Sequence, residues 1–82
     1  MPVTQGEKHV AFAEYLRALF KESPVPDGSP VFTKSEILSF RIQALNLAGS
    51  GDLQGCKVYL NACAVPMDSA MVTMRMIYGD RA

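Results

Sequence analysis

The chain has 82 residues, and its eight Lys and Arg balance eight Asp and Glu, so its formal net charge is zero with His9 neutral. This length has room for one hydrophobic core, and we expect residues 1–82 to form a single small globular domain. Apolar residues make up 49% of the chain, which argues against a disordered protein. The balanced charge argues against a dedicated nucleic-acid-binding protein, because such proteins carry a basic excess that displaces counterions.

The sequence also predicts a compartment. The N-terminal residues lack the basic stretch and apolar run of a secretory signal. The most apolar stretch, residues 57–78, contains too many polar residues to match a bilayer span of about 20 apolar residues. Cys56 and Cys63 would lie ~10 Å apart on one helix, beyond the ~7 Å that a disulfide allows. We therefore expect a soluble, cytoplasmic protein with reduced cysteines.

The first helix is predicted over residues 5–22. Thr4 and Glu7 have the spacing of a capping box, in which two orphan backbone donors at the helix start are satisfied. Apolar residues then recur at three- and four-residue intervals, at Val10, Ala13, Leu16, Leu19 and Phe20. Residues 23–31 contain three prolines and an Asp-Gly pair, so they are expected to form a connector that ends this helix.

A second capping-box pattern, Thr33 with Glu36, opens the next predicted helix. Polar residues share one sector of its helical wheel, at Glu36, Ser39, Gln43, Asn46 and Ser50, and apolar residues fill most of the rest. Residues 38–44 alternate as a strand would, but Asn46-Leu47 breaks the alternation. Gly49-Ser50-Gly51 is expected to end the helix, because glycine readily adopts the left-handed cap conformation.

Two further helices are predicted in the last third of the chain. Asp52 would cap a helix over residues 53–65 that Pro66 closes, and Asp68 or Ser69 would cap a helix over 68–78 that Gly79 ends. The segments 57–60 and 72–78 are also rich in β-branched and aromatic residues. We therefore predict an all-α, four-helix domain. The alternative is an α+β fold with N-terminal helices on a C-terminal β-hairpin or small antiparallel sheet.

Residues 37–70 resemble one degenerate tetratricopeptide unit. The resemblance rests on large and small residues at the spacings of that repeat, namely Phe40, Ala44, Leu47, Gly51, Asp52, Cys56, Leu60 and Cys63. The pattern departs from the family where cysteines replace the usual alanines and where proline comes two positions early. Only one unit is visible, so the resemblance implies a helical hairpin and no more.

No catalytic, cofactor or metal site is predicted. The glycines of 49–55 could cradle a phosphate only after a parallel strand, and a helix is predicted there instead. His9 is the single imidazole and is expected on the polar side of its helix beside Glu7 and Lys8. One histidine and a C-x6-C pair match no structural zinc spacing. We expect a protein that is not an enzyme.

Four methionines stand within ten residues near the C-terminus, at Met67, Met71, Met74 and Met76. Methionine is flexible and polarizable, so it suits both gaps in a core and adaptable interfaces. We expect a small intracellular protein-interaction module (an adaptor, regulator or chaperone-like protein) that forms a homodimer. Its predicted contact surface consists of Met71, Met74, Ile77, Tyr78 and Phe40.

A different function class stays open, that of a small nucleic-acid-binding transcriptional regulator. The basic residues are spread along the chain and interleaved with acids, which is typical of a solvated surface. This alternative would need Arg41, Lys57 and Arg75 on one face of the molecule to follow a phosphate backbone.

Overall fold

The computed structural model describes residues 4–27 and 31–79, and these form four helices and no strands. The helices are α1 (Gln5–Glu22), α2 (Lys34–Ser50), α3 (Leu53–Leu60) and α4 (Met67–Tyr78). The predicted all-α architecture is confirmed. The β-hairpin alternative is wrong, because residues 57–60 belong to α3 and residues 72–78 to α4. Of the predicted connector, residues 28–30 lie outside the described part of the chain.

Local hydrogen bonds set most helix ends where the sequence predicts them. The Thr33 hydroxyl accepts from the Glu36 backbone N–H (3.2 Å), and the Glu36 carboxylate accepts from the Thr33 N–H (3.0 Å), which completes the capping box of α2. Asp52 caps α3 by accepting from the Gly55 N–H at 2.9 Å. These contacts depend on neighbouring residues alone, so they form whatever the helix packs against.

The third helix is shorter than predicted. It ends at Leu60, and residues 61–64 form a turn in place of the expected last turn of helix. The N–H groups of Ala62 and Cys63 donate three residues back, to Tyr59 (2.9 Å) and Leu60 (3.2 Å). Ala64 then adopts a positive φ of 58°, a conformation that a residue with a Cβ seldom takes. The chain is thereby redirected before α4, which begins at Met67 directly after Pro66.

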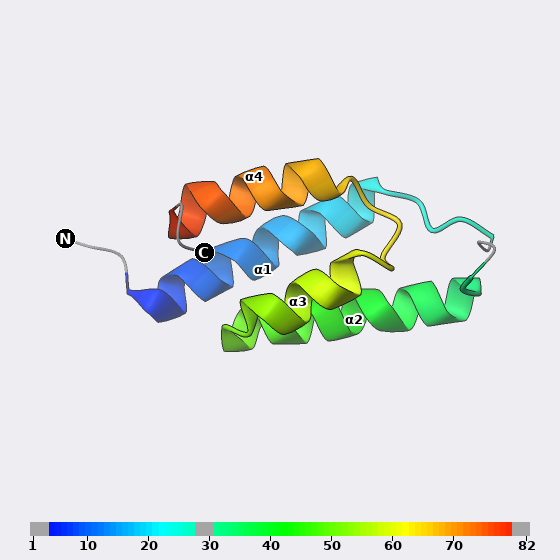
Figure 1. Cartoon of the computed structure of the whole chain (residues 1–82), viewed down its shortest axis with the longest axis horizontal. Helices are drawn as coiled ribbons and strands as arrows, with labels where there is room; N and C mark the ends of the chain where they lie inside the picture. Colours follow the sequence, from blue (N-terminus) through cyan, green and yellow to red (C-terminus); the bar gives the residue numbers. More distant parts are fainter. Residues whose placement is uncertain (1–3, 28–30, 80–82) are drawn as a thin grey trace.

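The helices run antiparallel to their neighbours around α1. Figure 1 shows α4 along one side of α1, and α2 with α3 along the other. The contacts between elements follow the same plan, since α1 packs against both α2 and α4, and α3 packs against α2. The α2–α3 pair forms the helical hairpin that the repeat resemblance implies.

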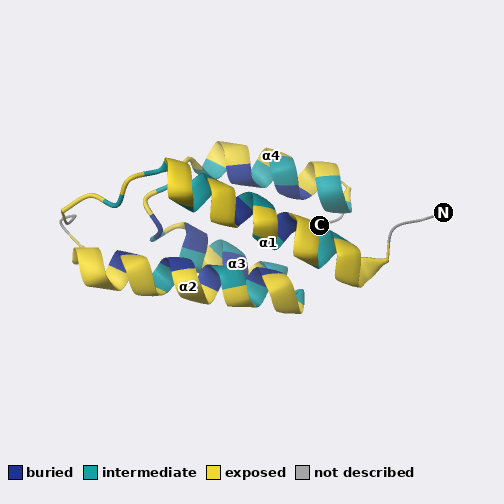
Figure 2. Cartoon of the chain, turned by 180° about the vertical axis from the view of Figure 1, so that it is seen from behind, coloured by how far each residue is buried: buried dark blue, intermediate teal, exposed yellow. Residues whose placement is uncertain are grey.

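The core lies between these helices. Figure 2 shows the buried positions turned inward along each helix. Its members are apolar side chains drawn from all four helices and the turn after α3, namely Phe12, Leu16, Ile37, Ala44, Ala48, Cys56, Leu60, Cys63, Ala70 and Met74. Arg41 is the one charged side chain buried among the described residues, with 5% of its surface exposed.

Candidate functional site

The structure does not bring the five predicted contact residues together on an open surface. Met74 belongs to the core with 2% of its surface exposed, so its placement on a binding surface was wrong. Met71, Ile77 and Tyr78 are half-buried and pack against that core. The predicted apolar stripe of α4 is therefore largely the inner face of the helix, and a small domain needs such a stripe for its own core. The exposed methionine of α4 is Met76, at 80%, which is not among the predicted contact residues.

Phe40, the fifth predicted contact residue, lies on α2 and is also half-buried. Its ring packs edge-on against Phe32, with the ring centroids 4.9 Å apart, and tilted against Tyr59 at 5.9 Å. This aromatic cluster links α2 to α3 and to Phe32, which precedes α2. Phe40 thus supports the fold within one chain.

His9 joins three parts of the structure, contrary to the prediction of a solvated side chain. Its Nδ1 lies 2.7 Å from the Tyr78 hydroxyl, which links the start of α1 to the end of α4. Its ring also lies against Gly51, where an added Cβ would come within 2.6 Å of Nε2. Burial raises the pKa of the Tyr78 phenol, and the nearby Cys56 raises it further. The imidazole of His9 thus contacts Tyr78 on one side and Gly51 on the other.

The two cysteines are buried free thiols. Burial raises the pKa of Cys56 to about 11, with smaller contributions from Cys63 and Asp52. Burial also raises the pKa of Cys63 to about 11, against the opposing charge of Arg41. Both groups are protonated at neutral pH, whereas a nucleophile or metal ligand needs the thiolate. Residues 4–27 and 31–79 also hold no group of three or more potential metal ligands from His, Cys, Asp and Glu.

Arg41 is held by backbone carbonyl groups from two segments. Its guanidinium donates to Phe20 (3.0 Å) and Ser23 (2.8 Å) at the end of α1, and to Cys63 (2.8 Å) and Ala64 (3.4 Å) in the turn after α3. It also stacks over the Phe20 ring, 5.2 Å from the centroid. Burial lowers its pKa, with Cys63 opposing the shift. Buried and fully engaged, Arg41 does not share an open face with Lys57 and Arg75.

The sequence carried a signal for the burial of Arg41. Positions 37, 41, 44 and 48 follow the three- and four-residue spacing of one helical face, and the other three are core residues. A charge at the centre of such a face indicates an interior partner. The partner could not be identified from sequence, because it consists of carbonyl groups distant along the chain.

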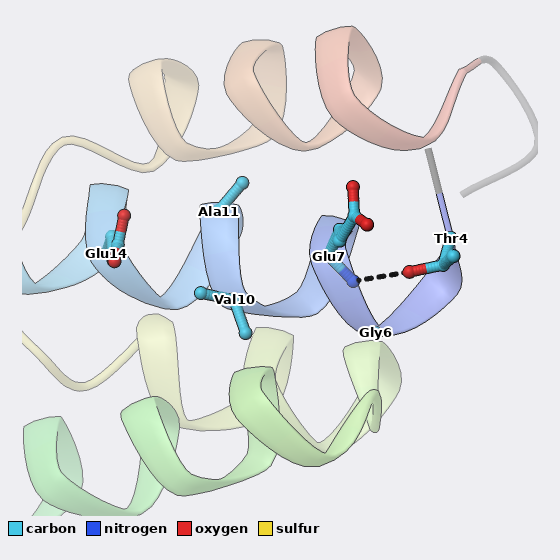
Figure 3. Close-up of a pocket in the computed structure, with 6 residues that line it drawn as sticks. All are labelled: Thr4, Gly6, Glu7, Val10, Ala11 and Glu14. Atoms are coloured by element: carbon cyan, nitrogen blue, oxygen red, sulfur yellow. Dashed lines mark hydrogen bonds between the residues drawn. The ribbon is translucent and has the colours of Figure 1, made fainter. Parts of the chain in front are cut away.

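Surface depressions lie on α1 and on α4. Figure 3 shows the one on α1, which is lined by Thr4, Gly6, Glu7, Val10, Ala11 and Glu14. Its one drawn hydrogen bond, from the Glu7 N–H to the Thr4 hydroxyl (3.2 Å), is the helix cap. The α4 depression is lined by Asp68, Ser69, Val72 and Thr73. Neither lining contains a base paired with a nucleophile, so neither resembles an active site.

A different surface of α2 combines exposed apolar side chains with an absence of exposed charge. Leu38 and Ile42 lie one turn apart and are 45% and 59% exposed, and Leu45 is half-buried beside them. Gly49 continues the same line, and an added Cβ there would meet open space. We call Leu38, Ile42, Leu45 and Gly49 the outer α2 face. Between Glu36 and Asp52 the only charged residue is Arg41, which is buried.

Exposed apolar residues occur on the other helices as well, at Val10, Val58, Val72 and Met76. Val10 on α1 lies near exposed Glu7 and Glu14, and Met76 on α4 follows Arg75. The outer α2 face differs from these positions in lying on a segment, residues 37–51, in which no exposed residue is charged. Prediction missed it, although the wide apolar arc of residues 37–48 indicated that α2 is apolar on more than one side.

Comparisons of the chain with protein-family models, curated proteins and solved structures found no match. Within the part of the chain that the structure describes, no helix has the length and apolar character needed to cross a membrane.

Proposed function

We propose that this chain is a non-catalytic protein-interaction module and that its contact surface is the outer α2 face. The observation that carries the proposal is the exposure of Leu38 and Ile42 within a helix segment that exposes no charge. The centres of protein interfaces are depleted of charged residues, which are kept at the rim. The proposal moves the contact surface from α4, where the sequence predicts it, to α2.

The environment of α2 supports this assignment. The helix buries Ala44 and Ala48 in the core and exposes Ser39, Gln43 and Asn46 on its polar side, and it also carries the apolar strip of Leu38, Ile42 and Leu45. A polar side opposite the buried stripe is normal for a surface helix, but that of α2, unlike that of α1, exposes no charged residue between residues 37 and 51. Removing the rest of Leu38 and Ile42 from water would contribute about 2 kcal/mol to binding. An extended apolar strip of this kind fits a partner helix.

The reactive groups of the chain also favour binding over chemistry. Both thiols are buried and protonated at neutral pH. The single imidazole contacts the Tyr78 hydroxyl through Nδ1 and packs against Gly51. A role as adaptor, regulator or chaperone-like protein uses none of these groups.

Photocrosslinking from single positions in cells of the source organism tests the proposal. A photoreactive phenylalanine analogue replaces Ile42 in one variant and Val58 in a matched control, because Val58 is a similarly exposed apolar residue (69%) on α3. We expect position 42 to give a discrete protein adduct and position 58 to give none. Equal adducts from both positions, or no adduct from position 42, would contradict the proposal.

A further inference from the structure

The four methionines of α4 differ in their exposure to solvent, although they lie on one helix. Met74 is a core residue with 2% of its surface exposed, and Met67 and Met71 are half-buried and pack against the core. Met76 is 80% exposed. It follows Met74 by two residues, which is about 200° around the helix and therefore places it on the opposite side. The helix thus covers three thioethers wholly or in part and presents the fourth to solvent.

A thioether in this position reacts with hydroperoxides. The sulfur lone pair attacks one oxygen of hydrogen peroxide, so that an S–O bond forms while the O–O bond breaks. The other oxygen leaves and takes up the proton of the first through solvent water, which gives one molecule of water. The sulfur is oxidised by two electrons to the sulfoxide, and the peroxide is reduced. The step needs the oxidant at the sulfur and water beside it, so exposure controls its rate.

The thiols of the chain do not compete with Met76 for the oxidant. Cys56 and Cys63 are completely buried. Burial also raises the pKa of each thiol to about 11, so both are protonated at neutral pH. Peroxide reacts with the thiolate and not with the thiol. Among residues 4–27 and 31–79, Met76 is therefore the sulfur-containing side chain most open to a dissolved oxidant.

We propose that Met76 is a modification site at which a hydroperoxide converts the exposed thioether into a sulfoxide while the domain stays folded. The sulfoxide oxygen of Met76 is hydrated, so it needs no donor from the protein. At Met74 the same oxygen would be a buried acceptor without a partner, which is costly. Val72 lies one turn before Met76 and is 54% exposed, so the reaction adds a polar group beside an apolar one on the outer side of α4. The site is separate from the outer α2 face, and its test does not depend on the proposed function.

Tryptic peptides of the oxidised chain measure the reaction at each methionine. Cleavage after Lys57, Arg75 and Arg81 places Met76 alone in the peptide 76–81 and the other three methionines of α4 in the peptide 58–75. The purified full chain is exposed to excess hydrogen peroxide at neutral pH, and catalase stops the reaction at intervals. Mass spectrometry then counts the added oxygen atoms, and fragmentation assigns them within 58–75.

We expect Met76 to be oxidised at least about tenfold faster than Met74, because Met74 reacts only when the helix opens. Met67 and Met71 should react at intermediate rates. Equal rates at Met76 and Met74 would overturn the inference. The matched control is the same reaction in urea that unfolds the chain, where the four rates should agree within about twofold. A preference for Met76 that persisted in urea would also overturn it, because neighbouring residues and not the fold would then cause the selectivity.

Urea unfolding followed by circular dichroism tests whether the modified domain stays folded. Protein with one oxygen at Met76 should unfold within about 0.3 M urea of the untreated protein. Met76→Gln, which places a polar side chain of similar length there, should behave in the same way. Met74→Gln is the buried counterpart, and it should lower the midpoint by at least about 1 M or abolish the folded state. Unfolding of the domain on oxidation of Met76, or equal midpoints for the two glutamine variants, would overturn the proposal.

Discussion

Arg41 forms hydrogen bonds with backbone carbonyl groups of two segments, the end of α1 and the turn after α3. The last carbonyl groups of a helix have no partner within it, and those of α1 carry the negative end of its dipole. The guanidinium supplies donors to Phe20 and Ser23 at this end and to Cys63 and Ala64 in the turn after α3. The turn holds Ala64 at a positive φ, so the same side chain fastens a strained segment.

Replacing Arg41 by methionine should destabilise the fold by about 3–5 kcal/mol. Methionine fills similar space but donates no hydrogen bond, so buried carbonyl groups would be left without a partner. Arg75→Met is the matched control, because Arg75 is exposed on α4, and its effect should stay within about 0.5 kcal/mol. Urea unfolding followed by circular dichroism measures both. A loss below about 1 kcal/mol for Arg41→Met would contradict this role.

At the scale of elements, the turn between α2 and α3 determines how three segments meet. Gly51 has a φ of 88°, and its N–H donates to Ala48 at 3.2 Å to close the end of α2. Its missing side chain leaves room for the ring of His9, which in turn contacts Tyr78. The end of α2, the start of α1 and the end of α4 are thereby held at one end of the molecule.

Gly51→Ala should therefore cost about 2–3 kcal/mol. The added methyl would meet the His9 ring at 2.6 Å and would also be forced into the left-handed backbone region. Gly49→Ala is the internal comparison, because it lies within α2 and has open space around it. That change should be neutral or stabilise the protein by up to about 1 kcal/mol. Thermal unfolding of the two variants should show opposite shifts, and equal shifts would contradict this account of the turn.

At the scale of the whole molecule, the interior contains groups that resist losing their protons. The pKa values of Cys56 and Cys63 are raised from 9.0 to about 11, and burial also raises that of Tyr78. A group whose pKa is higher in the folded state stabilises the fold while it is protonated. That contribution is complete below the unfolded pKa and is lost as the pH rises through the folded pKa.

We predict that stability falls as the pH rises from about 9 to about 11. Each thiol should contribute a loss of about 1–2 kcal/mol. Urea unfolding at about pH 8 and about pH 10.5 measures the difference. A variant carrying Cys56→Ala and Cys63→Ala starts less stable but should lose less between the two pH values. An equal loss in wild type and variant would assign the alkaline sensitivity to other groups.

Local sequence determined where most of the helices begin and end. The capping box of Thr33 and Glu36, the Asp52 cap and the stop at Gly79 act through residues a few positions apart, and all are present in the structure. The predicted end of α3 was wrong, because the fold diverts residues 61–64 into a turn although no glycine or proline before Pro66 would end the helix there. The four-helix fold itself follows from these local signals and the spacing of apolar residues.

Only the tertiary structure decided which apolar residues face inward. The helix α2 carries two apolar stripes, and its packing in the fold buries Ala44 and Ala48 in the core while leaving Leu38 and Ile42 outside. The same selection places Met74 in the core and Met76 in solvent. Helical spacing alone does not distinguish the two stripes, because each repeats at three- and four-residue intervals. The neighbours that cover one stripe come from distant parts of the chain, so the outer α2 face became visible only once the helices were packed.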